Sequence, residues 1–397
     1  MKNEWQSRAL GDICAVANGG TPKTGVANYW DGRHLWITPA EMGKRFSPYV
    51  GNTARKITDA GLSNSSARML PPHSVILSSR APIGHLVINT EPMATNQGCK
   101  GLVPGAEIEC KFLYYYLSSI VDLLNALGTG ATFKELSGVK LKEVPVPVPP
   151  LPEQHRIVAI LDEAFEGIAT AKANAERNVE NARAVFESHL QSVFAQRGPG
   201  WVEKRLGDVV TRLTNGFVGP TRNIYKESGV PYLLARHVKN NRLLFDGRTF
   251  ISDEFNRKNK KSMLKAGDVL LVQSGHIGHS AVVTEEHEGH NCHAMIVITA
   301  VEGAFIGPFL SLFFNSSGMK QKFQEIRSGS TVPHLTCGEV RELMVALPDL
   351  ATQRSLVDHS RELDEEAQRL ARLYERKRAA LEALKKSLLH RAFAGEL

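Results

Sequence analysis

The stretch from Pro149 to Arg197 constrains the fold of this chain more than any other segment. After Pro152 it contains no proline until Pro199, and its apolar residues recur every three or four positions, which is the spacing of one helix face. These positions are Ile157, Leu161, Ala164, Ile168, Ala171, Ala175, Val179, Ala182, Phe186, Leu190 and Val193, with one phase shift between Ala175 and Val179. At about 1.5 Å of rise per residue, the predicted helix is roughly 65 Å long, and its apolar face requires a partner.

A second stretch of this kind ends the chain. Its heptad a/d positions are Leu356, Ser360, Leu363, Ala367, Leu370, Tyr374, Lys377, Leu381, Leu384 and Leu388. If the two helices pair within one chain, the second must run back along the first, so we expect an antiparallel two-helix coiled coil. The residues expected in this seam, or in docking a partner there, are Ile157, Leu161, Ile168, Phe186, Leu190, Leu363, Leu370, Leu381, Leu384 and Leu388.

An internal repeat organises the rest of the chain. Leu10-Gly11-Asp12 returns as Leu206-Gly207-Asp208, and Ser79 to His85 returns as Gln273 to His279. The repeat continues into the helices, where Ser188-His189-Leu190 answers Ser387-Leu388-Leu389. The predicted order is therefore domain, helix, domain, helix, with boundaries at residues 1–148, 149–198, 199–348 and 349–397, and with the two domains related by a pseudo-two-fold axis.

Within each domain, short apolar runs bounded by glycine and proline predict strands, and longer runs such as Lys111 to Leu117 predict helices. We therefore expect a mixed α/β class, with twisted and irregular sheets in two tandem domains.

The composition narrows the function classes. The chain has 397 residues, 42% of them hydrophobic, and a formal net charge of +7, which permits a polyanionic partner without requiring one. No apolar run reaches the roughly 18 residues of a membrane span, and no signal-peptide core follows Met1, so we expect a cytoplasmic protein without membrane contact.

Catalytic equipment is scarce in the sequence. There is no G-x-x-x-x-G-K-[ST] phosphate loop and no acidic pattern of a metal-dependent nuclease. One cluster offers zinc-type ligands within eighteen residues: His276, His279, His287, His290, Cys292 and His293. The alternative, which we favour, is that these are polar loop residues near a binding face, so we expect no metal and no catalytic residue.

Basic and amide side chains follow the predicted strands of both domains. Arginine and lysine can neutralise phosphates, arginine can read guanine, and asparagine or glutamine can read adenine. The candidate DNA-binding residues are Lys23, Lys44, Arg45, Arg80, Asn96, Gln97, Lys100, Thr132, Arg222, Arg236, Lys239, Gln273, His276, Asn291, Ser330 and Thr331. The last two and Thr132 belong to repeated Gly-Thr/Ser turns, for which ordinary helix capping is the competing interpretation.

The sequence resembles the specificity subunit of Type I restriction–modification systems. The likeness rests on Leu-Gly-Asp near each domain start, on Ser79 to Gly84 with Asn96 to Lys100, and on Pro149-Pro150-Leu151-Pro152-Glu153-Gln154 opening a long helix. The ending from Ser387 to Leu397 is similar too, and the likeness covers the whole chain. The second copy departs from the pattern, because Pro348-Asp349-Leu350-Ala351-Thr352-Gln353 replaces the Pro-Pro-Leu-Pro-Glu-Gln form.

This resemblance implies that each domain reads one half of a bipartite double-stranded DNA target, and that the helices set the spacer. It implies two methyltransferase subunits and two restriction subunits as partners, with S-adenosylmethionine, ATP and Mg²⁺ bound by those partners and no cofactor in this chain. Three other hypotheses stay open: a stand-alone bipartite DNA-binding protein, a coiled-coil adaptor between proteins, and, last, a metal-dependent enzyme.

Overall fold

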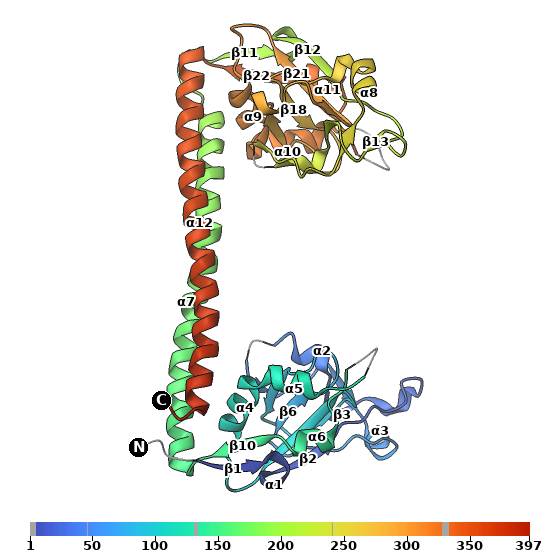
Figure 1. Cartoon of the computed structure of the whole chain (residues 1–397), viewed down its shortest axis with the longest axis vertical. Coiled ribbons are helices and arrows are strands. Elements are labelled where there is room, and N and C mark those ends of the chain that lie inside the picture. Colours follow the sequence, from blue (N-terminus) through green and yellow to red (C-terminus); the bar gives the residue numbers. More distant parts are fainter. Residues whose placement is uncertain (1–4, 46, 131–133, 240, 328–332) are drawn as a thin grey trace. The chain divides into compact units, whose positions relative to one another are not determined.

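The structure, a computed structural model, describes residues 5–45, 47–130, 134–239, 241–327 and 333–397. It divides into two compact units, Met1–Ala175 with Arg376–Leu397, and Glu176–Glu375. Each unit consists of a mixed α/β domain and a part of each of two long helices (Figure 1). The expected α/β class with two repeated domains is confirmed.

Unit 1 contains a twisted sheet in the order β2-β9-β6-β7-β4, a smaller sheet β5-β3-β8 and the antiparallel pair β1-β10. Strands β2, β9, β6 and β7 pair antiparallel, whereas β4 joins β7 and β8 joins β3 in parallel. The strands are β1 Gln6–Ala9, β2 Cys14–Asn18, β3 Trp30–Ile37, β4 Tyr49–Val50, β5 Arg55–Ile57, β6 Val75–Ser78, β7 Leu86–Asn89, β8 Met93–Thr95, β9 Cys99–Pro104 and β10 Pro145–Val148. The helices of this domain are α1 Leu10–Ile13, α2 Pro39–Met42, α3 Asp59–Ser63, α4 Cys110–Ser119, α5 Val121–Leu127 and α6 Gly138–Lys142.

Unit 2 repeats this topology with different residues. Its main sheet has the order β12-β21-β18-β19, which matches β2-β9-β6-β7, and the pair β11-β22 matches β1-β10. The strands are β11 Val202–Arg205, β12 Val210–Asn215, β13 Tyr225–Lys226, β14 Val230–Leu233, β15 Val238–Lys239, β16 Arg242–Leu243, β17 Phe250–Ile251, β18 Val269–Val272, β19 Ser280–Val282, β20 Asn291–Cys292, β21 Met295–Ala300 and β22 Met344–Leu347. The helices are α8 Asp253–Lys258, α9 Gly307–Asn315, α10 Ser317–Ile326 and α11 Cys337–Arg341.

Side-chain caps mark where the short helices begin. Thr58 accepts a hydrogen bond from the amide of Gly61 at the start of α3, and Ser137 does the same for Lys140 in α6. Thr336 and Glu339 form a reciprocal capping box on α11. Such caps satisfy amides that have no partner inside the helix, and each typically stabilises its helix by about 1 kcal/mol.

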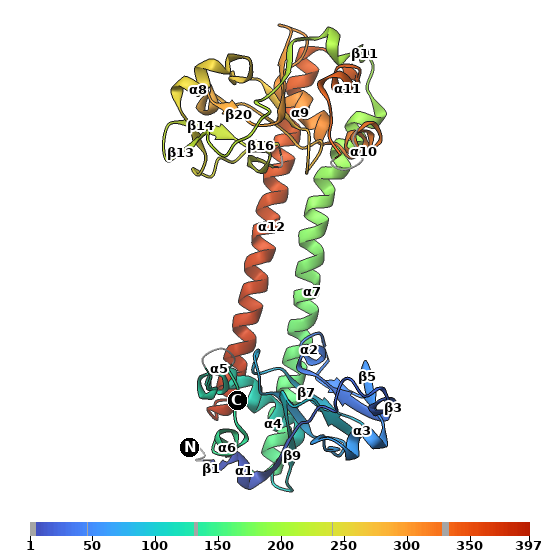
Figure 2. The same ribbon diagram turned by 90° about the vertical axis from the view of Figure 1, so that its right-hand side faces the viewer.

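The long helices are α7, Leu151–Gln196, and α12, Leu350–Phe393. In unit 1, Lys172 pairs with Glu382 at 2.5 Å, and the Lys385 ammonium lies 5.0 Å from the centre of the Phe165 ring. In unit 2, the ring of His189 packs on that of His359. Within each unit, residues later in α7 contact residues earlier in α12, so the two helical segments are antiparallel (Figure 2).

The heptad prediction for α12 holds only in part. Ser360 and Ala367 are buried as expected, but Leu384 is 47% exposed and Lys377 is exposed. Leu389 and Ala392 are buried instead. Both belong to the core of the first domain, so the last turns of α12 bury the face that meets this domain. A strict seven-residue stripe, which drifts by about 20° per heptad on a straight helix, does not follow that face. The placement of Leu384 in the seam is therefore wrong.

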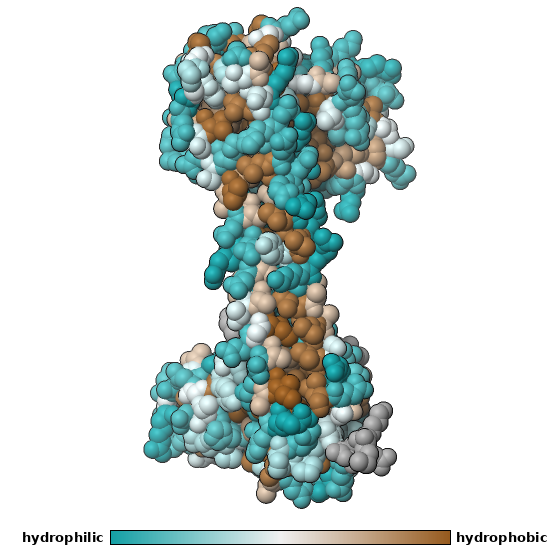
Figure 3. All heavy atoms as spheres, turned by 90° about the vertical axis from the view of Figure 1, so that its left-hand side faces the viewer, coloured by the Kyte–Doolittle hydropathy of each residue, from teal (hydrophilic) through white to brown (hydrophobic). Residues whose placement is uncertain are grey.

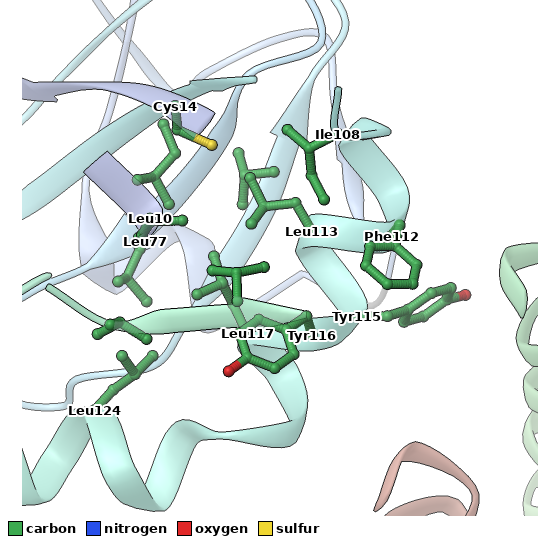
Figure 4. Packing of buried hydrophobic residues seen from close by; sticks show 14 of the residues in the cluster. Leu10, Cys14, Leu77, Ile108, Phe112, Leu113, Tyr115, Tyr116, Leu117 and Leu124 are labelled. Atoms are coloured by element: carbon green, nitrogen blue, oxygen red, sulfur yellow. The ribbon is translucent and has the colours of Figure 1, made fainter. Parts of the chain in front are cut away.

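Each domain core continues onto the helices. In unit 1, the core contains Leu113 and Leu117 of α4 (Figure 4). The same core includes Ile157 and Leu161 of α7 and Leu389 and Ala392 of α12. In unit 2, Phe194 of α7 packs edge-on against Phe309 and Phe313 of α9. Each large side chain buried in this way contributes about 1.5–3 kcal/mol, so the helix ends are parts of the domains. Among the described residues, no helix combines the length and apolarity needed to cross a membrane.

Candidate nucleic-acid interface

Three predicted residues of the first domain lie together where β6 ends and β9 begins. The amide of Ser79 donates to the carbonyl of Gly98 at 2.7 Å, which holds the two chain segments side by side. The Asn96 Nδ2 donates to the hydroxyl of Thr21 at 2.8 Å, and that hydroxyl in turn donates to Gln97. Arg80, Asn96 and Gln97, which the sequence offered as candidates in loops after strands, are thus brought to one edge of the sheet.

The charges at this edge form a small cluster. The Arg80 guanidinium is exposed and lies 3.1 Å from a carboxylate oxygen of Glu135. Lys100 lies beneath the surface, 6% exposed, and burial lowers the pKa of its ammonium, an effect that Glu135 opposes and Arg80 reinforces. Arg80 is therefore the cation that a ligand would meet first, with Lys100 adding positive potential from below.

The amides differ in how available they are. Both ends of the Asn96 side chain are used within the protein, because its Oδ1 also accepts from the amide of Gly98 at 2.8 Å. Gln97 is exposed. Gln97 is therefore better placed than Asn96 for reading a base edge, and Asn96 shapes the loop.

The other basic candidates of the first domain are separate from this cluster. Lys23 and Lys44 are exposed, whereas Arg45 binds Glu41 at 2.6 Å and the carbonyl of Asn52 at 2.6 Å. Thr132 lies outside the described residues.

The second domain has the equivalent edge at the end of β18. The amide of Leu335 donates to the carbonyl of Gln273 at 2.8 Å, just as the amide of Leu136 donates to that of Ser79. Gln273 is 9% exposed, and its Oε1 has no hydrogen-bond partner in the described part of the chain. His276 is exposed beside it. The Gln273 Oε1 is itself buried, so the imidazole of His276 is the group that this edge presents to a ligand.

Asn291 was a wrong candidate. Its side chain is fully buried, and its Nδ2 donates to Asn256 Oδ1 at 2.9 Å and to the carbonyl of Asn259 at 3.2 Å. It lies in the short strand β20, paired parallel with β14, where an amide satisfies backbone groups instead of facing a ligand.

The remaining candidates of the second domain that the structure describes lie on the surface. Arg222 and Lys239 are exposed, and Arg236 lies 3.2 Å from Asp246. Ser330 and Thr331 lie outside the described residues.

The histidine cluster divides into separate sites. The rings of His276 and His279 are 5.5 Å apart, and those of His287 and His290 are 5.6 Å apart, while His293 lies against Tyr232. Burial raises the pKa of the Cys292 thiol to about 12, so it is protonated at neutral pH. In the described ranges, no three histidine, cysteine or acidic side chains converge as metal ligands do, so the zinc alternative gains no support.

The expected seam and docking residues lie mostly inside the helix pairs. Ile157, Leu161, Ile168 and Leu190 are buried, and Phe186, Leu363, Leu370, Leu381 and Leu388 are partly buried. Exposed apolar side chains remain on the helical part of unit 1, where Leu384 neighbours the exposed Ala380 and Ala383 (Figure 3).

Two residues of the first cluster were missed from the sequence. Thr21 contacts both Asn96 and Gln97 from a loop 75 residues earlier, and Glu135 neutralises Arg80. Both contacts join residues that are far apart in the sequence, so sequence patterns do not predict them. The one indication in the sequence was that Thr21 directly follows the Asn18-Gly19-Gly20 turn.

Comparison with known proteins decides the family. The sequence model described as the Type I restriction modification DNA specificity domain matches residues 2–180 and again 199–374. The chain belongs to this specificity family. The double match coincides with the internal repeat.

Individual relatives of the family agree. The chain is 28% identical over 295 residues to the Type I restriction enzyme MjaIX specificity subunit of Methanocaldococcus jannaschii, an alignment covering 69% of this chain and 67% of that protein. It is 22% identical over 356 residues to the EcoBI specificity subunit of Escherichia coli, covering 82% and 74%.

Two solved structures share the fold. One, described as the structural basis of complex assembly and conformational transition of the type I R-M system, has a TM-score of 0.78 at 18% identity, covering 100% of this chain and 99% of that one. The other, the HsdS subunit of Thermoanaerobacter tengcongensis, has a TM-score of 0.63 at 18% identity, covering 100% and 98%.

Proposed function

We propose that this specificity-family chain is the DNA-recognition subunit of a Type I restriction–modification complex. Each globular domain reads one half of a bipartite duplex target, and α7 and α12 set the spacer between the halves. The helices also dock the methyltransferase subunits, for which the exposed apolar side chains near Leu384 are suited.

The observation that carries this proposal is the repeated strand edge. The ends of β6 and β18 occupy the same position in two domains of one topology, and both present polar side chains that are not committed to helix or sheet. Arg80 and Gln97 suit guanine and adenine, and the exposed His276 imidazole of the second edge can form a hydrogen bond with a base. One fold with two different edges suits two different half-sites.

In this proposal the chain performs no chemistry itself. Two methyltransferase subunits bind S-adenosylmethionine and methylate adenine, and two restriction subunits use ATP and Mg²⁺. The chain contributes affinity for phosphates through exposed cations such as Lys23 and Lys44, and this affinity falls with rising salt.

The test is a methylation assay with the chain purified alone and together with the methyltransferase subunit of its system. We expect adenine methylation at one bipartite sequence from the pair and none from the chain alone. Methylation by the chain alone would refute its non-catalytic role. Specific binding without any effect on the methyltransferase would favour a stand-alone DNA-binding protein.

A substitution localises the readout. Arg80→Ala should weaken discrimination at one base pair of one half-site by about 1–3 kcal/mol, because a bidentate contact to guanine has that value. Arg33→Ala removes an exposed arginine of the same domain, 77% exposed and paired with Asp59, and should leave that half-site unchanged. Equal effects of the two changes would exclude Arg80 as a base-reading residue.

A further inference from the structure

A buried glutamine joins α7 to the first domain. Gln154 lies in the first turn of α7 and is fully buried. Its Nε2 donates to the carbonyls of Glu107 and Pro149, each at 2.8 Å, and its Oε1 accepts from the amide of Glu109 at 2.7 Å. The amide therefore uses both donors and its acceptor on three backbone groups.

The same arrangement recurs in unit 2. Gln353, also fully buried, donates to the carbonyls of Ala304 at 3.4 Å and Pro348 at 2.9 Å, and accepts from the amide of Ile306 at 3.0 Å. In both units one partner is the proline before the helix, and two belong to the loop that leads from the main sheet into α4 or α9.

These hydrogen bonds differ in kind from the other contacts between helix and domain. Ile157 and Leu161 pack into the core through apolar surface, which stabilises without fixing direction. A side-chain amide held by three backbone atoms requires defined distances and angles. Methionine in place of Gln154 would fill a similar volume but would remove the side-chain partner of three backbone groups, one of them buried and two partly buried.

We propose that Gln154 and Gln353 are positioning residues that fix the direction of each domain on its helices and thereby restrict the DNA spacer. This inference rests on the proposed function. From Gln154 to the end of unit 1 at Ala175, α7 rises about 30 Å at 1.5 Å per residue, so a tilt of about 6° displaces its far end by about 3.4 Å, one base-pair step. A small loosening at the glutamine is therefore enough to admit a neighbouring spacer length.

The experiment uses the full chain with its methyltransferase on a DNA library in which both half-sites are constant and the spacer length varies. For Gln154→Met and for Gln353→Met, we expect methylation at spacers one base pair longer and shorter to rise about tenfold relative to the preferred spacer, the change that loss of about one net hydrogen bond allows. The half-site sequences should stay the same.

A matched control separates positioning from stability. Ile76 is a buried residue of β6, away from Gln154. The change Ile76→Val should lower the melting temperature without changing which spacer lengths are methylated. If Gln154→Met does not fold, Gln353→Met gives the same readout in unit 2, where the hydrogen bond to the carbonyl of Ala304 is longer, at 3.4 Å.

The outcomes are distinct. An unchanged spacer distribution in the folded variants would overturn the positioning role while leaving the proposed function intact. Absence of methylation at any spacer with the wild-type chain would instead contradict the proposed function.

Discussion

Asp268 is a buried acid of unit 2 that has no acidic counterpart at the equivalent position of unit 1. Asp268 is 1% exposed and accepts from the Arg212 guanidinium, from the hydroxyl of Thr299 at 2.5 Å and from the amide of Lys265 at 2.7 Å. By strand register, the positions of Arg212, Asp268 and Thr299 are held in unit 1 by Ala15, Ser74 and Val103. The same fold thus exists with and without this ion pair.

We predict that Asp268→Ala destabilises unit 2 by about 3 kcal/mol or more, because it leaves the Arg212 charge partly buried and unpaired. The combined change Arg212→Ala, Asp268→Ser and Thr299→Val, which copies unit 1, should cost less than the single change. Hydrogen exchange of the β18 and β21 amides measures the loss of stability in the single and in the triple variant. A larger loss in the triple variant would show that the ion pair itself stabilises the domain.

The identity of Gly19 is fixed because the backbone of Asn96 lies too close to allow a side chain. A Cβ at this position would stand 1.9 Å from the carbonyl oxygen of Asn96, and one at the equivalent Gly216 would stand 2.6 Å from that of Cys292. Both glycines follow an asparagine that ends the first strand of the main sheet.

Gly19→Ala should therefore displace the loop carrying Asn96 and Gln97 and weaken binding to one half-site at least tenfold, roughly the value of one base contact. Gly25→Ala is the matched control, since nothing lies within 4 Å of a Cβ there. DNA binding by fluorescence anisotropy measures both variants. Equal affinities for Gly19→Ala and the wild type would show that the loop is not part of the interface.

At the scale of elements, the loops of the second domain bury several imidazoles. Burial lowers the pKa values of His237, His279, His290 and His293 below the ordinary value near 6.5. A histidine with a lowered folded pKa takes up its proton more readily in the unfolded chain, so its contribution to stability is complete above pH 6.5 and is lost as pH falls through the folded value.

We therefore predict that unit 2 loses stability as pH falls below about 6.5, with His237 contributing at most about 1.4 kcal/mol per pH unit. Protection factors from hydrogen exchange of the β18 amides measure this loss. His237→Asn should flatten the dependence. If the stability of this variant depends on pH as steeply as that of the wild type, His237 does not cause the loss.

The elements also show where sequence reasoning succeeded. The prolines and the periodicity predicted α7 and α12, and the repeat predicted two domains of one topology, because those signals are local or internal to the chain. Asn291 could not be placed, since its burial depends on Asn256 and Asn259, 35 and 32 residues away. The role of Gln154 was also invisible, because its partners Glu107 and Glu109 meet it only in the folded domain.

At the scale of the whole molecule, the length of α7 and α12 is proposed to set the length of the DNA spacer. One heptad inserted into both α7 and α12 at matched depth adds about 10.5 Å, or about three base pairs. We predict a longer preferred spacer with unchanged half-sites, read by the same spacer library. An unchanged spacer would contradict the role of the helices in setting it.

In the proposed function, each domain reads its half of the target independently. Exchanging residues 1–148 for the corresponding segment of a relative with a known target, and sequencing the adenines methylated in a host carrying the complex, tests it directly. We predict that the methylated target has a new sequence in one half-site and an unchanged sequence in the other. A change in both half-sites would contradict it.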